Sequence, residues 1–126
     1  MLKAIRTENA PAPGGAYSQA IRAGAFLYTA GVGPRDPKTH DIVGETIEEQ
    51  THQVLKNLKA ILEAAGCSTR HVVKATVHLQ NLERDFAGFN GVYGQYFEEP
   101  YPVRTTVGSA LNGILVEMDL IAVAEA

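Results

Sequence analysis

The stretch from Pro100 to Ala126 reads PYPVRTTVGSALNGILVEMDLIAVAEA, and almost every position in it is apolar or small. It predicts two strands joined by a tight turn, because Asn112-Gly113 is the preferred pair for a two-residue type I′ loop. In such a hairpin, Gly108 would lie opposite Glu117.

Side chains alternate across a strand, so this register assigns each residue of the hairpin to one face of a sheet. One face is mostly apolar and should pack on helices: Val103, Thr105, Val107, Ile114, Val116, Met118 and Leu120. The other face holds Arg104, Thr106, Gly108, Leu115, Glu117, Asp119, Ile121 and Val123. Because this second face is too apolar to lie in water and helices cover only the first, the pattern indicates that another subunit covers it.

Two charged residues, Arg104 and Glu117, are expected on that second face, about 13 Å apart at the strand rise. The spacing is long for an ion pair but suits a small molecule held between them, since a guanidinium matches a carboxylate with two parallel hydrogen bonds. An alternative stays open, in which Arg104 pairs with an acid such as Asp119 and only fixes the register between subunits.

The composition predicts one cytoplasmic domain that spans residues 1–126. The net charge of −3 gives no general attraction to nucleic acid or to anionic lipid. No apolar run approaches the roughly 20 residues that span a bilayer, and the first residues, MLKAIRTENAPAP, become acidic and proline-rich too early for a signal sequence. We therefore expect neither a nucleic-acid partner nor a membrane.

Two helices are predicted. The first begins at a capping box of Thr46 and Glu49 and stops at Gly66, which accepts the left-handed conformation. Its apolar stripe comprises Val54, Leu55, Leu58, Ile61, Leu62 and Ala65. The second helix, over residues 82–97, depends on an aromatic side made of Phe86, Phe89, Tyr93, Tyr96 and Phe97.

Further strands are predicted upstream of the hairpin. HVVKATVHL, residues 71–79, alternates, with Val73, Ala75, Val77 and Leu79 on one side. Two short strands within residues 17–31 surround a turn at Ala23-Gly24, and the turn-rich stretch 32–45 is expected to be a surface loop.

The single cysteine and the four histidines do not indicate a metal centre. Cys67 cannot form an internal disulfide and is expected to be a small apolar side chain, since a catalytic thiol would need a neighbouring cation. The histidines lack the spacing of metal ligands: His40, His52, His71 and His78.

Beyond these patterns, the chain resembles the Rid family of reactive-intermediate deaminases over almost its whole length. This family is also known as the YjgF or L-PSP endoribonuclease family. The resemblance is carried by TENAPAPGGAYSQAI (residues 7–21), LKNLKAILEAAGC (55–67), VVKATVHLQNLERDFAGFNGVYGQYF (72–97), and by YPVRTTVG (101–108) followed by LVEMDLIAV (115–123).

The resemblance implies an α+β fold. The subunit would be chorismate-mutase-like, of the YjgF type, with a mixed β-sheet and two helices packed on one face. Three copies would form a homotrimer with an inner β-barrel and three sites at the subunit interfaces, in agreement with the apolar second face inferred from the hairpin.

The resemblance also implies a hydrolytic deaminase that needs neither metal nor cofactor. Such members act on the enamines and imines that pyridoxal-phosphate enzymes release, of the 2-aminoacrylate/2-iminopropanoate and 2-iminobutanoate type, and give 2-oxo acids and ammonia. An iminium carbon is already electrophilic, so the protein need only orient it and present water.

The family's functional residues match particular positions of this chain. Arg104 would clamp the substrate carboxylate, Glu117 would position or activate the attacking water, and Tyr17 would line the pocket. Further substrate-binding positions implied by the match are Asn90, Gly31, Ala30, Thr105 and Thr106.

Three departures from the family's pattern point to a shifted substrate. Ala30 replaces a usual serine, Thr106 replaces a usual cysteine, and Ala16 replaces a common proline. Two other functions remain open beside the deaminase. One is a trimer that binds small carboxylates without turnover, as a regulator or chaperone-like protein. The other is the ribonuclease of the family's second name, against which the acidic charge balance argues.

Overall fold

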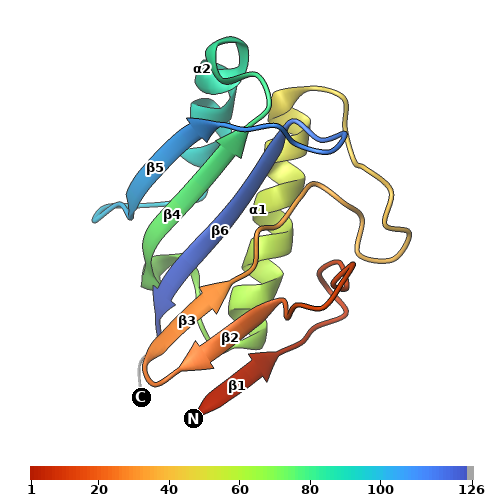
Figure 1. The fold of residues 1–126 in the computed structure, drawn as a ribbon. Coiled ribbons are helices and arrows are strands. Elements are labelled where there is room, and N and C mark those ends of the chain that lie inside the picture. Colours follow the sequence, from red (N-terminus) through yellow and green to blue (C-terminus); the bar gives the residue numbers. More distant parts are fainter. Residues whose placement is uncertain (125–126) are drawn as a thin grey trace.

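One mixed sheet of six strands is covered on one side by two helices in the computed structural model, which describes residues 1–124 (Figure 1). The strand order is β1-β2-β3-β6-β4-β5. In chain order the elements are β1 (Leu2–Ile5), β2 (Ala20–Ala23), β3 (Phe26–Thr29), α1 (Ile47–Ala64), a short 3₁₀ turn (Thr69–His71), β4 (Val72–Leu79), α2 (Leu82–Tyr93), β5 (Val103–Gly108) and β6 (Val116–Val123). The expected α+β subunit with both helices on one face is confirmed.

Helix α1 forms as its sequence predicts. Thr46 accepts a hydrogen bond from the backbone N–H of Glu49 at 3.1 Å, and the Glu49 carboxylate accepts one from the backbone N–H of Thr46. The helix ends before Gly66, whose φ of 76° suits a residue without a side chain. All six residues of the predicted stripe are buried, so α1 packs on the sheet through its apolar face.

The predicted hairpin of the last two strands is wrong. Strand β5 pairs in parallel with β4, and β4 pairs on its other edge with β6, so β4 lies between the two expected partners. The segment β4-α2-β5 is therefore a crossover unit, in which the helix carries the chain back to the start of a parallel neighbour. Gly113 does turn, with φ of 80°, but within a longer connection.

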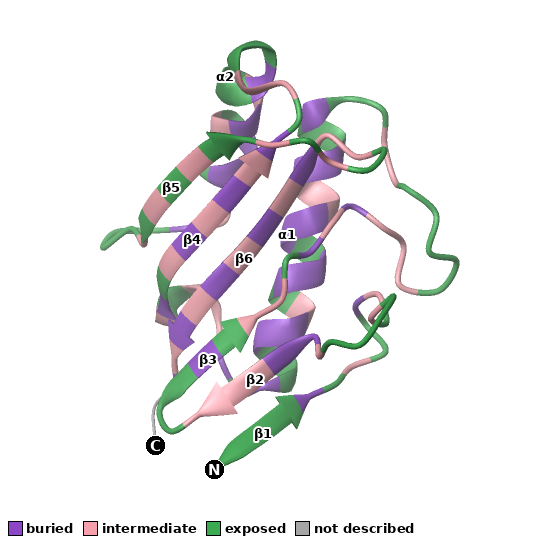
Figure 2. Cartoon of the chain, in the orientation of Figure 1, coloured by how far each residue is buried: buried purple, intermediate pink, exposed green. Residues whose placement is uncertain are grey.

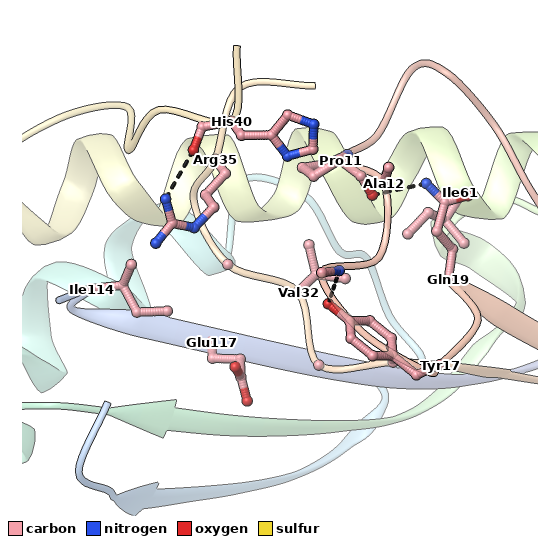
Figure 3. Close-up of a pocket in the computed structure, with 14 residues that line it drawn as sticks. Pro11, Ala12, Tyr17, Gln19, Val32, Arg35, His40, Ile61, Ile114 and Glu117 are labelled. Atoms are coloured by element: carbon pink, nitrogen blue, oxygen red, sulfur yellow. Dashed lines mark hydrogen bonds between the residues drawn. The ribbon is translucent and has the colours of Figure 1, made fainter. Parts of the chain in front are cut away.

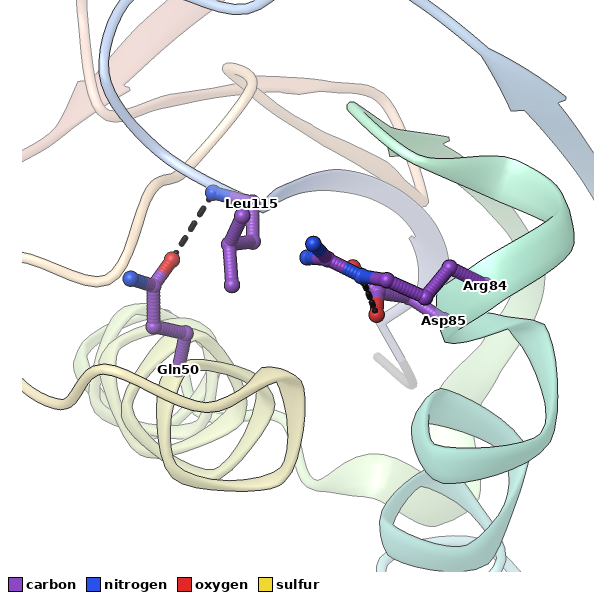
Figure 4. A network of polar contacts seen from close by, with 4 residues as sticks. All are labelled: Gln50, Arg84, Asp85 and Leu115. Carbon is purple, nitrogen blue, oxygen red and sulfur yellow. Dashed lines mark hydrogen bonds and ion pairs between the residues drawn. The ribbon is translucent and has the colours of Figure 1, made fainter.

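That connection, residues 109–115, passes over the end of β4. Seven residues can span about 23 Å, which exceeds the roughly 10 Å between strands two places apart. Its path is anchored where the Gln80 carboxamide accepts from the Leu111 N–H at 2.6 Å and the buried Gln50 accepts from the Leu115 N–H at 2.8 Å. Figure 4 shows Gln50 of α1 reaching Leu115, with the Arg84–Asp85 ion pair of α2 nearby.

The new pairing reverses the faces assigned to β5. Arg104 lies beside Ala75, and Thr106 lies beside Val77, on the side of the sheet that the helices cover. The opposite side of β5, which no helix covers, carries three exposed residues: Val103, Thr105 and Val107. The alternation of side chains along β5 was predicted correctly. It could not show which of the two alternating sets of residues faces the helices, because small and apolar residues occupy both sides of this strand.

Along β4 and β6, buried residues alternate with half-buried ones (Figure 2). The half-buried residues, on the side without helices, are Lys74, Thr76, His78, Glu117, Asp119, Ile121 and Val123. We call the side of the sheet that carries these residues the open face.

Smaller differences from the predictions concern the ends of elements. Val73 is exposed, not buried, because a bulge between Val72 and Lys74 shifts the register of β4. Helix α2 ends at Tyr93 rather than at residue 97, although Phe97 remains in the core. Strand β1 was not predicted. Neither helix of the described chain is both long and apolar enough to cross a membrane.

Candidate functional site

A cavity of about 380 Å³ opens between the start of β6 and the loop that follows β3 (Figure 3). Its walls include Tyr17, Ala30, Gly31, Arg35, His40, Ile114 and Glu117. It thereby brings together four of the residues that the sequence singled out: Tyr17, Ala30, Gly31 and Glu117.

The contact between Gly31 and Glu117 explains why a glycine is needed there. Val32 donates its backbone N–H to the Met118 carbonyl at 2.7 Å and accepts from the Met118 N–H at 3.1 Å, which fixes the loop against β6. A Cβ on Gly31 would lie 2.7 Å from Glu117 Oε2 and 3.0 Å from its Cδ. The absence of a side chain at Gly31 therefore leaves the space in which the carboxylate sits.

Tyr17 is held at the mouth of this cavity by the N-terminal segment. Its hydroxyl accepts a hydrogen bond from the Gly14 N–H at 3.0 Å, while the residue as a whole remains 55% exposed. The neighbouring Gln19 is buried and donates to the carbonyls of Thr7, at 3.0 Å, and Pro11, at 2.9 Å. This buried amide ties the first residues of the chain to β2 and so positions the tyrosine.

Arg104 lies elsewhere, between β5 and α2. Its Nη2 donates to Oδ1 of Asn90 at 2.7 Å, and its guanidinium carbon lies 4.7 Å from the ring centroid of Tyr93. Phe89 and Phe86 lie at 5.4 and 5.8 Å. The cation is thus held by one amide and by aromatic faces, an arrangement that leaves most of its five N–H groups available to an anion.

Within residues 1–124, Arg104 forms no ion pair with an acidic side chain, and Glu117 forms none with a basic side chain. The alternative pairing of Arg104 with Asp119 is therefore wrong within the chain, because Asp119 lies on the open face. Burial raises the pKa of Asp119, and the nearby charges of His78 and Lys74 partly oppose that shift. Burial likewise raises the pKa of Tyr93, against the opposing charge of Arg104.

The expected site residues therefore form two half-sites. The acid half-site comprises Tyr17, Ala30, Gly31 and Glu117. The arginine half-site comprises Asn90, Arg104 and Thr106. Thr105 belongs to neither, since it faces the open side of β5. The predicted placement of Arg104 and Glu117 on one face is wrong, because Arg104 lies on the side of the sheet that α2 covers and Glu117 lies on the open face.

Several residues close to the two half-sites were not predicted to belong to a functional site. The aromatic residues of α2 that contact Arg104 were predicted only to pack this helix on the sheet. A lone arginine on an adjacent strand could have suggested a cation–π contact with them. Arg35 and His40 of the cavity wall were read as parts of a surface loop. Among residues 1–124, no three His, Cys, Asp or Glu side chains cluster closely enough to hold a metal ion.

Comparison with known proteins identifies what the chain is similar to. Residues 7–124 match the model of a family described as Endoribonuclease L-PSP. A RutC family protein of Pyrococcus horikoshii is 51% identical over 127 residues, covering 99% of this chain and 100% of that protein. Reactive Intermediate Deaminase A, chloroplastic, of Arabidopsis thaliana is 45% identical over 102 residues, covering 81% of this chain and 54% of that protein.

A solved structure carries the same fold with a small ligand. The crystal structure of E. coli TdcF with bound serine superposes with a TM-score of 0.90 at 37% identity, covering 98% of this chain and 99% of that one. This likeness confirms the predicted YjgF-type fold.

Proposed function

The chain belongs to the Endoribonuclease L-PSP family, and on that premise we propose that it is a hydrolytic deaminase of small carboxylate-bearing imines. The substrates are of the 2-aminoacrylate/2-iminopropanoate and 2-iminobutanoate type, and the products are 2-oxo acids and ammonia. The proposal is supported by the name of the Arabidopsis relative and by the serine in TdcF, an amino acid of the same size class. The observation that carries it is the pair of half-sites, one with an unpaired acid and one with an unpaired cation.

The two half-sites belong together only if different copies of the chain supply them. Within one chain Arg104 and Glu117 face opposite sides of the sheet, two strands apart. A second copy whose β5 edge lies against the open face would bring its Arg104 to the acid half-site. We propose that three copies arranged in this way, with open faces inward, form a homotrimer around a barrel of strands, with three sites at their interfaces.

Each half-site has a chemical role in the proposed reaction. Arg104 binds the substrate carboxylate through its free N–H groups, and Asn90 holds the guanidinium in place. Glu117 accepts a proton from a water molecule as that water adds to the C=N carbon. Glu117 then returns this proton to the nitrogen of the carbinolamine. Ammonia leaves as the C–N bond breaks, and the hydroxyl group loses its proton as the carbon becomes the ketone of the 2-oxo acid.

Gly31 and Tyr17 support this step by position. Gly31 has no side chain that would occupy the space beside Glu117 Oε2, so the carboxylate keeps its place in the cavity wall. Tyr17 lines the same cavity, where its half-exposed ring can contact the substrate. The expected substrate-binding role of Thr106 is a hydrogen bond from its hydroxyl on the same side of β5 as Arg104.

The proposal is tested by ammonia release from imines that an amino-acid oxidase generates in place, with the spontaneous rate subtracted. We expect Arg104→Ala to lower the enzymatic rate about 100-fold or more, because the carboxylate loses its orienting partner. Arg70→Ala is the matched control, since the Arg70 side chain is 79% exposed and, within residues 1–124, forms an ion pair only with the exposed Glu98.

The other outcomes identify the alternatives. Binding of a 2-oxo acid with no ammonia above the spontaneous rate would replace the deaminase with a carboxylate-binding protein. Cleavage of RNA that persists in Arg104→Ala after repeated purification would replace both with a ribonuclease.

A further inference from the structure

The cavity beside Glu117 contains a second cation that the proposed reaction does not use. Arg35 lines the same cavity as Glu117, together with His40 and Ile114. Its Nη1 donates to the His40 carbonyl at 2.8 Å, and Figure 3 shows the guanidinium at the wall between His40 and Ile114. Neither Arg35 nor Glu117 forms an ion pair within residues 1–124.

The position of Arg35 is rigid because α1 holds its backbone. The buried Asn57 donates through Nδ2 to the carbonyls of Gly33, at 3.1 Å, and Arg35, at 2.9 Å. The loop then closes on itself, since Arg35 forms an isolated bridge with Ile42. A side chain that rises from such a fixed backbone is suited to recognise a ligand.

His40 strengthens the same point. Its φ of 67° places a residue other than glycine in the left-handed region, where strain accumulates at functional sites more often than elsewhere. The conformation is held because the His40 N–H donates to the Asp36 carbonyl at 2.9 Å. It turns the His40 carbonyl toward Arg35, which fixes one end of the guanidinium and leaves the remaining donors free.

The cavity is also larger than the smallest imines require. In the single chain its volume is about 380 Å³, within the range of small-molecule sites. A three-carbon imine next to Glu117 would fill only a part of it. The remainder is the space into which the side chain of a longer substrate would extend.

We propose that this cavity is a side-chain subsite in which Arg35 binds a second acidic group, so that the protein deaminates imines of dicarboxylic amino acids. The inference rests on the proposed function and adds a substrate class to it. The α-carboxylate binds Arg104 of a neighbouring copy, the imine carbon lies at Glu117, and the distal carboxylate reaches Arg35. Without Arg35 that distal charge would be buried beside Glu117 with no partner, which is costly.

The reaction balances as it does for the smaller substrates. Water adds across the C=N bond of an imine such as 2-iminosuccinate, Glu117 takes and returns a proton, and ammonia leaves. The product is the corresponding 2-oxo diacid, and the distal carboxylate is unchanged.

The test compares kcat/KM for the imine made from aspartate with that for the imine made from alanine, each generated by its own oxidase. In Arg35→Gln the diacid-to-monoacid ratio should fall roughly 10- to 100-fold, the value of one charge-assisted hydrogen-bonded pair. Two contacts that hold the loop, the hydrogen bond from Asn57 to the Arg35 carbonyl and the bridge between Arg35 and Ile42, do not use the Arg35 side chain, so the loop should keep its structure in this variant. Arg35→Lys should retain most of the ratio, and Arg70→Gln should leave it unchanged.

A ratio that is the same in Arg35→Gln and in the wild type overturns the subsite, because a residue that only braces the loop affects both substrates equally. A wild-type protein that hydrolyses the monoacid imine but not the diacid imine also overturns it, while the proposed function stands.

Should neither imine be hydrolysed, the proposed function fails and calorimetry still decides the subsite. In that case succinate should bind more tightly than propanoate, and Arg35→Gln should abolish the difference. Equal binding of the two acids would exclude the subsite.

Discussion

Arg104 and Glu117 lie on opposite faces of one sheet, with β4 between their strands. The arginine points to α2 and contacts Asn90, whereas the glutamate lines a cavity beside Gly31. If both residues act on one substrate molecule, Arg104 of one copy must act together with Glu117 of another copy. Under the proposed function, an oligomer is therefore a condition for activity, and a mixture of two variants tests this.

Mixing two inactive variants should restore activity. Arg104→Ala and Glu117→Ala each lack one half-site, but a site formed between an Arg104→Ala copy and a Glu117→Ala copy can contain both wild-type residues. In a ring with head-to-tail interfaces, random mixing in equal amounts gives roughly one quarter of the sites their full set. Co-expression with two affinity tags and measurement of ammonia release checks this value.

The control is each variant co-expressed with a second copy of the same variant under the two affinity tags, and these proteins should remain inactive. Co-purified mixed oligomers without any recovered activity would show that the two residues do not share a site.

Gly31→Ala should impair turnover more than folding. The new Cβ would lie 2.7 Å from Glu117 Oε2, so the carboxylate must move. A displacement of this order commonly lowers kcat by about 10- to 100-fold. Gly91→Ala is the matched control. The new Cβ would have no neighbour within 4 Å in the described part of the chain, so this variant should keep full activity and gain up to about 1 kcal/mol of stability through helix propensity. Equal kcat in Gly31→Ala and the wild type would contradict a role for the Glu117 position.

Much of the fold could be predicted from local sequence, and α1 shows why. Its capping box, its stripe and Gly66 each act within a few residues, so their signals do not depend on the rest of the chain. The pairing of β5 is different, because strand alternation and an Asn-Gly turn describe neighbours along the chain only. The helix between β4 and β5 was the available signal for a parallel crossover, and it outweighs the turn.

The candidate site likewise contains residues that could be predicted from the sequence and residues that could not. Tyr17, Gly31 and Glu117 come together as the resemblance implied, yet no pattern in one chain reveals that Arg104 belongs to another half-site. Arg35 was missed because it stands in a loop, where charge is ordinary. Its meaning arises only from the buried Asn57 that fixes the loop, a contact between distant residues.

The capping box of α1 should make stability depend on acid pH. Hydrogen bonds from the backbone N–H groups of Glu45 and Thr46 lower the pKa of Glu49 from its ordinary value of 4.5. A depressed folded-state pKa means that the stabilisation is complete above pH 4.5 and is lost as the pH falls through the folded value. Glu49→Gln should therefore be less stable than the wild type at pH 7, and the two should converge in acid. Urea unfolding of both proteins at several pH values measures this; a constant difference at all pH values would contradict it.

The hydroxyl of Tyr93 should be dispensable for folding. It is buried and has no hydrogen-bond partner within residues 1–124, although its ring lies under Arg104. Tyr93→Phe removes this unsatisfied group and keeps the aromatic face, so the protein should become more stable by up to about 1 kcal/mol.

Tyr96→Phe is the matched substitution with the opposite expected sign. The Tyr96 hydroxyl lies 2.9 Å from Nδ1 of His52, and its loss should cost about 1 kcal/mol because that hydrogen bond disappears. Denaturant midpoints of the two variants measure the difference. If Tyr93→Phe is instead destabilised as much as Tyr96→Phe, the Tyr93 hydroxyl must have a partner in the assembled protein, and a loss of substrate affinity in the same variant would locate that partner at the Arg104 half-site.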